Sequence, residues 1–242
     1  MVIATSITQD YLKQSQPLFD SGVKNWKGRR ICFTIGFKED IEGWETIYVP
    51  STECTWKPSN RKNYQSLQHG EWVNYLNLPL NEMVLFVDSD MELQRPFDLD
   101  MPHTDKICVT ACSWPQLHLY EVIKNIGGDS KKMADGYKAF IQREFCGCFI
   151  LTSVKTWLTI YANCKSLYPM LKHFNHHAAW QLLINVAVSG MRMTMLPEFV
   201  CNAVWYNGTK AKIMEGNLWV EDEKVYFNHT KFNNDTQLAN GN

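Results

Sequence analysis

The segment from Met83 to Asp90 constrains the fold most, because an apolar run leads directly into two carboxylates. Five consecutive apolar residues, 83–87 (MVLFV), are followed by Asp88, Ser89 and Asp90. An uninterrupted apolar run rich in β-branched and aromatic residues is typical of a strand that is buried on both faces. Such strands occur in parallel sheets that carry helices on both sides. The sequence therefore predicts an α/β fold with an acidic pair at the carboxyl end of a central strand.

The position and chemistry of this acidic pair predict a metal site. In open α/β sheets, ligands bind just beyond the carboxyl ends of the strands. The carboxylates of Asp88 and Asp90 are hard oxygen ligands, which suit a divalent cation shared with the phosphates of a substrate. Mn²⁺ or Mg²⁺ is the expected cofactor, and a metal-assisted nucleotide-sugar site is the leading hypothesis.

Length and composition limit the other possibilities. With 242 residues, 45% hydrophobic and 13% aromatic, the chain can bury a full core, and we expect one domain over residues 1–232 with a disordered tail at 233–242. The formal net charge is −1 and no block of Lys or Arg occurs, so a nucleic-acid partner is not expected.

The chain shows no targeting signal that the sequence can reveal. The N-terminus lacks a basic flank followed by an apolar region, and no window approaches the ~18 apolar residues of a membrane span. We therefore expect a cytoplasmic protein without a membrane span. The eight cysteines, in a chain this long and apolar, are interpreted as buried small hydrophobic residues.

The order of the predicted elements supports a parallel sheet. Strand, helix and strand alternate from the N-terminus, which is the pattern of right-handed crossovers. Strands are expected at residues 2–5, 31–35, 46–49, 83–87, 107–112, 148–152 and 193–196. Helices are expected from an N-cap at Thr8, at 64–76, at 154–161 and at 177–189, and a long excursion at 114–143 is expected to form an acceptor-side loop or lid.

Several motifs together resemble the GT-A nucleotide-sugar glycosyltransferases, and most closely the retaining group that includes glycogenin and the lipopolysaccharide galactosyltransferases. The resemblance runs over most of the chain. Its motifs are residues 2–11 (VIATSITQDY), Asp88-Ser89-Asp90 followed by residues 95–97 (RPF), residues 144–150 (EFCGCFI), 179–185 (AWQLLIN), Leu196-Pro197 with Asn202, and 225–229 (VYFNH). It implies a mostly parallel twisted sheet flanked by helices, with a smaller C-terminal acceptor-side region from about residue 114.

The resemblance also implies roles for individual residues. The positions of Thr5, Ser6 and Tyr11 would face the base and ribose of the nucleotide. From the residues alone, Ser89 is expected to space the two carboxylates, and a contact of its hydroxyl with the ribose is left open. His229 would complete the metal shell formed by Asp88 and Asp90. The implied reaction transfers a hexose from a nucleotide-diphosphate sugar, most simply a UDP-sugar, to a hydroxyl acceptor.

The sugar-side residues are predicted from a helix face and a strand. Gln181 and Asn185 are four residues apart, so they share one face of a helix whose other positions are apolar. Such polar groups need partners, and hydrogen bonds to the donor sugar and satisfaction within the core are both open. Glu144 is the second catalytic candidate. The resemblance implies a retaining reaction, whereas an inverting one requires a carboxylate base, for which Glu144, Asp135 or Glu198 are available.

The sequence departs from the GT-A motifs at two positions, and two alternative functions remain open. Trp180 stands where the helix motif has Asp, and Phe145 stands where the strand motif has Asn. A phosphatase of the haloacid dehalogenase type also carries Asp-x-Asp after an apolar strand, but that motif normally opens the domain. The other alternative is a catalytically silent module that binds a sugar nucleotide or a glycan.

Overall fold

The computed structural model describes most of the chain. The described residues are 1–50, 68–99, 101, 106–111, 145–171, 179–188, 190–197, 199–202, 211–220 and 222–229. The expected excursion at 114–143 and the expected tail at 233–242 lie outside these residues, as does the first part of the helix expected at 64–76.

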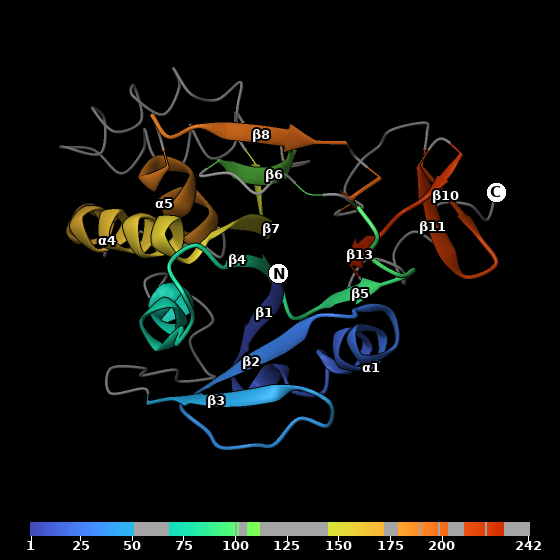
Figure 1. The fold of residues 1–242 in the computed structure, drawn as a ribbon, viewed down its shortest axis with the longest axis horizontal. Helices are drawn as coiled ribbons and strands as arrows, with labels where there is room; N and C mark the ends of the chain where they lie inside the picture. The colour runs from blue at the N-terminus through green and yellow to red at the C-terminus, as the bar shows by residue number, and fades with distance from the viewer. Residues whose placement is uncertain are drawn as a thin grey trace.

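A sheet of seven strands forms the centre of the molecule (Figure 1). Its members are β1 (Val2–Ile7), β2 (Arg29–Ile35), β3 (Glu45–Val49), β4 (Met83–Val87), β6 (Ile107–Ala111), β7 (Phe145–Ser153) and β8 (Met193–Leu196). They lie in the order β3-β2-β1-β4-β7-β6-β8. All neighbours pair in parallel except β7, which is antiparallel to both β4 and β6. The predicted fold class, an α/β fold with a mostly parallel sheet, is confirmed.

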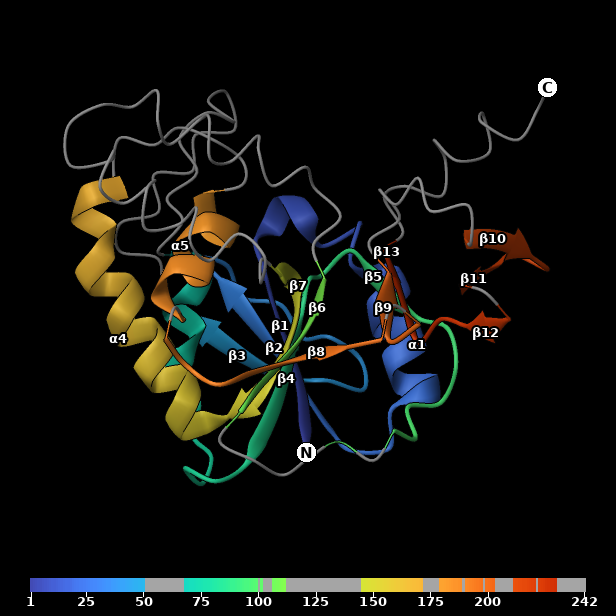
Figure 2. The same cartoon turned by 90° about the horizontal axis from the view of Figure 1, so that it is seen from above.

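Helices cover one face of the sheet, and a helix and a small sheet cover the other (Figure 2). On one side lie η2 (Gln68–Tyr75), α4 (Val154–Leu171) and α5 (Ala179–Ala187). On the other side lies α1 (Gln16–Asn25) with a three-stranded sheet in the order β5-β13-β9. These strands are β5 (Met91–Leu93), β13 (Phe227–His229) and β9 (Cys201–Asn202).

A third sheet lies beside this side of the molecule. It contains β10 (Ala211–Met214), β11 (Asn217–Val220) and β12 (Glu223–Lys224) in an antiparallel order. Both small sheets draw on the C-terminal part of the chain, where the smaller region was expected. None of the helices in the described part of the chain is long and apolar enough to cross a membrane.

Aromatic packing fixes the helical face of the sheet. The indole of Trp72 in η2 stacks on Phe86 of β4 with ring centroids 4.8 Å apart, and it meets Trp157 of α4 edge to face at 5.0 Å. The indole N–H of Trp157 donates to the carbonyl of Val84 at 3.2 Å. All of these rings are buried, so β4 is held rigidly up to the residue before the acidic pair.

Two of the predicted helices need correction. The helix expected from Thr8 is interrupted: a 3-10 turn, η1 (Gln9–Tyr11), comes first and α1 begins only at Gln16. The Thr8 side chain makes no capping hydrogen bond, and Pro17 favours a helix start because it lacks a backbone N–H and sits in the first turn. The helix expected at 154–161 continues to Leu171, because apolar positions such as Cys164 keep one face buried.

Candidate functional site

The strand order identifies where a ligand should bind. From β1 the chain runs outward through β2 and β3, and it then returns to add β4 on the opposite side of β1. This reversal is a topological switch point, and ligands of open α/β sheets bind beyond the carboxyl ends of the two strands that flank it. Those ends are Ile7 of β1 and Val87 of β4. The acidic pair follows directly after the second of them.

A tight turn carries the two carboxylates. The backbone N–H of Met91 donates to the carbonyl of Asp88 at 3.3 Å, which closes a turn over residues 88–91. The N–H of Asp88 donates to the carbonyl of Cys148 in β7 at 3.1 Å, so the turn starts from a strand that is still paired. Ser89 and Asp90 are each only 9% exposed, whereas Asp88 is half-buried. A short, anchored connection between β4 and β5 thus holds both aspartates close to the switch point.

The end of β1 is tied to the end of β4. The Thr5 hydroxyl, fully buried, donates to the carbonyl of Val87 at 2.9 Å. The register places Ala4 opposite Phe86, and continuing it by two residues brings Ser6 level with Asp88. Tyr11 ends η1, the turn that leaves this edge of the sheet, and it is half-buried. Thr5 and Ser6 therefore lie at the carboxyl end of β1 beside the acidic turn, and Tyr11 follows that strand by four residues. The Thr5 hydroxyl is buried against the Val87 carbonyl, so it does not face a nucleoside in this structure.

The C-terminal strand β13 returns to the same place. It pairs antiparallel with β5, and His229 lies opposite Met91, the residue after Asp90. The predicted third metal ligand is thus brought next to the predicted pair from the far end of the sequence. The His229 side chain itself lies outside the described part of the structure.

Helix α1 fixes β5 from the other side. The N–H of Leu93 donates to the Ser21 hydroxyl at 3.0 Å, and the Asn25 amide donates to the carbonyl of Leu93 at 2.6 Å. These bonds satisfy both backbone groups of the last β5 residue. They make β5 a fixed support for the acidic turn before it and for β13 beside it.

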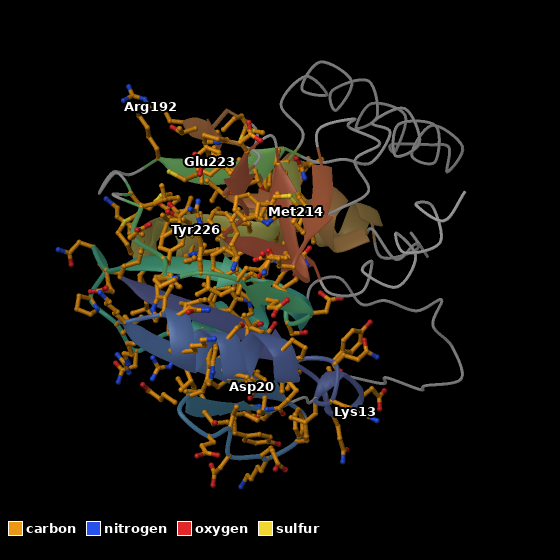
Figure 3. The ribbon with its side chains drawn as sticks, turned by 90° about the vertical axis from the view of Figure 1, so that its right-hand side faces the viewer. Lys13, Asp20, Arg192, Met214, Glu223 and Tyr226 are labelled. Carbon is orange, nitrogen blue, oxygen red and sulfur yellow. The ribbon has the colours of Figure 1, made fainter. Side chains whose placement is uncertain are left out.

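An aromatic and charged cluster holds the start of β13. The Arg95 guanidinium lies 3.7 Å from the ring centroid of Tyr226, and the Tyr226 hydroxyl donates to the Asp98 carboxylate. This hydrogen bond holds the pKa of the Asp98 carboxyl below its usual range. The ring of Phe97 packs against Tyr226 with centroids 5.3 Å apart. Tyr226 is only 4% exposed. Arg192 and Lys13, in contrast, project outward in Figure 3.

The Asn185 side chain is hydrogen-bonded to the backbone of a neighbouring strand. Its side-chain oxygen accepts a hydrogen bond from the N–H of Phe145, and its amide nitrogen donates to the carbonyl of Phe145, both at 3.1 Å. Asn185 is 8% exposed and Phe145 is fully buried. The pair therefore ties α5 to the first residue of β7, which is the strand next to β4.

The remaining predicted sugar-side residues are described only in part or not at all. Gln181 lies in α5, one turn before Asn185 as expected, but its side chain is outside the described residues. Glu144, Asp135 and Glu198 also lie outside them. Their predicted catalytic roles stay predictions.

The acidic turn offers two carboxylates to a divalent cation. Among the side chains that the structure describes, no group of three or more His, Cys, Asp and Glu residues could hold a metal ion. Asp88 and Asp90 provide two carboxylates in one turn, and a cation shared with a diphosphate needs few protein ligands because the phosphates and water supply the rest. The two aspartates thus fit Mg²⁺ or Mn²⁺, and an imidazole from His229 would favour Mn²⁺.

Sequence reasoning missed two contacts around this site. The hydrogen bond between Tyr226 and Asp98 joins residues 128 positions apart. The two hydrogen bonds between Asn185 and Phe145 join residues 40 positions apart. A polar residue on an otherwise apolar helix face signalled that Asn185 needed a partner. Nothing in the sequence indicated which partner it would find.

The comparisons with known proteins give a likeness of fold. No protein-family model and no curated protein matches this chain. Among solved structures, the chain is similar to the galactosyltransferase LgtC, determined in complex with donor and acceptor sugar analogues. The TM-score is 0.54 with 12% sequence identity, over 95% of this chain and 86% of that one. The sheet order and this likeness together show that the chain has the GT-A fold.

Proposed function

We propose that this chain is a metal-dependent glycosyltransferase, which moves a hexose from a nucleotide-diphosphate sugar to a hydroxyl acceptor. The expected donor is a UDP-sugar. The observation that carries the proposal is the acidic turn at residues 88–90, placed at the switch point of a GT-A sheet. The similarity to a galactosyltransferase that binds donor and acceptor sugar analogues supports it.

We assign the metal-binding and nucleoside-binding roles to residues around the acidic turn. Asp88 and Asp90 would hold the cation and through it the diphosphate, with His229 as a third ligand on the strand that lies beside them. A bound Mn²⁺ or Mg²⁺ would neutralise the negative charge that grows on the leaving diphosphate. Ser6 and Tyr11 would contact the nucleoside at the carboxyl edge of β1, where backbone and side-chain groups converge.

The sugar side of the site is proposed from β7 and α5. Asn185 fixes the start of β7 through Phe145, and Gln181 lies one turn earlier on the same helix. Gln181 and Glu144 are the proposed groups that contact the transferred sugar. By the resemblance, the reaction retains the anomeric configuration, with a leaving-phosphate oxygen taking the acceptor proton.

The experiment that tests this function measures release of the nucleoside diphosphate. The protein is incubated with UDP-hexoses and Mn²⁺, and UDP is quantified with and without simple hydroxyl acceptors. Slow hydrolysis that depends on metal is the minimum expected result. Asp40→Asn, which removes an exposed carboxylate between β2 and β3, is the control and should release UDP at the wild-type rate.

The same assay separates the alternatives. A phosphatase of the haloacid dehalogenase type would release inorganic phosphate from phosphomonoesters and leave UDP-hexoses intact. A silent binding module would bind UDP and release none from the sugar. Where a product forms, proton NMR of its anomeric centre distinguishes retention from inversion.

A further inference from the structure

Three cysteines lie together behind the acidic turn. The thiols of Cys148 in β7 and Cys201 in β9 are 3.8 Å apart, measured between their sulfur atoms, and both residues are buried at 2% and 4% exposure. Cys146 lies two residues earlier on β7 and is only half-buried. None of these three cysteines is in a disulfide.

The two close thiols belong to different sheets. Cys148 is in the central sheet, and its carbonyl accepts the N–H of Asp88. Cys201 is in the small sheet, opposite Phe227 of β13, the strand that ends at His229. A covalent bond between the two sulfurs would thus join the two walls of the candidate site. Packing also holds these walls together, for example that of Phe149 against Phe227 with ring centroids 5.5 Å apart.

We propose that Cys148 and Cys201 are a disulfide-forming pair, oxidised by small disulfides that enter through Cys146. A disulfide has its sulfurs at about 2.05 Å, so the two sulfurs must approach by roughly 1.8 Å from their present contact. The inference does not depend on the proposed transferase activity. In the reduced form the two residues are buried cysteines, as the sequence predicts. Oxidation would give a second form of the protein, in which they are joined by a disulfide.

The chemistry balances with a low-molecular-weight disulfide such as oxidised glutathione. The Cys146 sulfur attacks the glutathione disulfide, forming a mixed disulfide and releasing one glutathione thiol. The Cys148 sulfur then attacks the Cys146 sulfur and releases the second glutathione thiol. Finally the Cys201 sulfur attacks the Cys148 sulfur and returns Cys146 to a thiol. Overall two protein thiols lose two electrons and two protons, and one glutathione disulfide becomes two thiols.

Peptide mapping tests the connection directly. The folded protein is treated with oxidised glutathione, its remaining thiols are blocked, and it is digested with trypsin without reduction. Trypsin places Cys146 and Cys148 on residues 144–155 and Cys201 on residues 193–210. The expected product is a linked pair of these peptides that disappears on reduction. Fragmentation of the linked pair between residues 146 and 148 then shows which of the two cysteines is bonded to Cys201, and it does so in the wild-type protein.

Variants and stability give an independent test. The oxidised wild type should melt about 5 °C higher than the reduced form, because the bond restricts the unfolded chain. This increase should vanish in Cys201→Ala and persist in Cys164→Ala. Cys164 is also buried, but it lies on the other side of the sheet in α4, and burial raises the pKa of its thiol to about 12.

The contrary outcomes are equally specific. The proposal is overturned if peptides 144–155 and 193–210 stay unlinked in the folded protein, or become linked only after denaturation with urea. It is also overturned if fragmentation assigns the link to Cys146. In Cys146→Ser, linkage by oxidised glutathione should slow at least ~10-fold, and an unchanged rate would contradict the entry through Cys146.

Discussion

His229 lies opposite Met91 in the antiparallel pairing of β13 with β5, so a residue near the C-terminus is placed one step from Asp90. Residues that face each other across such a pair have Cα atoms about 5 Å apart. The acidic turn and the last described strand therefore form one structural unit. The bonds from Ser21 and Asn25 to Leu93 hold this unit against α1.

The first prediction concerns His229→Ala. If His229 is the third metal ligand, its removal should raise the Mn²⁺ concentration for half-maximal UDP binding at least ~10-fold, while the melting temperature stays within a few degrees. The control is Lys224→Ala on β12, the strand that precedes β13 in the sequence, which should leave the Mn²⁺ titration unchanged. An unchanged titration curve for His229→Ala would show that the histidine is only structural.

The second prediction concerns Asp90→Asn. This substitution is nearly isosteric and removes only the charge, so the fold should persist. Release of UDP from a UDP-hexose should fall at least ~10²-fold, because a metal ligand that stabilises the leaving group is lost. Initial rates at saturating Mn²⁺ measure this, beside the control Asp40→Asn. Activity retained within a few-fold of wild type would exclude Asp90 as a ligand.

The third prediction concerns Asn185→Leu. A leucine of similar size cannot bond to Phe145, so a buried N–H and a buried carbonyl lose their partner. The free energy of unfolding should fall by about 3 kcal/mol. Asn163→Leu is the matched control, because the half-buried Asn163 side chain makes one such hydrogen bond, to the carbonyl of Ala187. Its substitution should lower the free energy of unfolding by less. Urea denaturation measures both, and equal midpoints would contradict the assigned role of Asn185.

The fourth prediction concerns pH and Tyr226→Phe. The hydrogen bond from Tyr226 lowers the pKa of Asp98 in the folded state, so its stabilising effect is fully present above the pKa of an unfolded aspartate, about 3.9. The effect is lost as pH falls through the lower, folded pKa. Tyr226→Phe should therefore lower the melting temperature by the same small amount at pH 7 and pH 5, and the difference should shrink below pH ~3.9. A difference that grows on acidification would contradict this assignment.

The central strand could be predicted because its sequence signal is local. Residues 83–87 are all apolar and all buried, and polar residues follow at once, so both the strand and the position of Asp88 were predictable. The strands around Ile31 and Thr46 were found from shorter apolar runs, ICF and IYV, and the strand at Met193 from the segment MTML, which Pro197 ends.

The small sheet could not be predicted from local patterns. Strand β9 has two residues and β13 has three, and their pairing depends on partners such as Met91 that are far away in sequence. The antiparallel direction of β7 is likewise decided by its connections rather than by its residues. Only the resemblance to GT-A enzymes indicated that His229 belonged with the acidic pair.

The most direct test of the central claim is a calorimetric titration of the protein with UDP. One titration contains Mn²⁺ and the other contains excess EDTA. We predict saturable binding with Mn²⁺ and at least ~10²-fold weaker binding in EDTA, because the diphosphate is held through a cation on Asp88 and Asp90 rather than through a basic cluster. Equal affinity in both titrations would contradict a metal-dependent nucleotide site at the acidic turn.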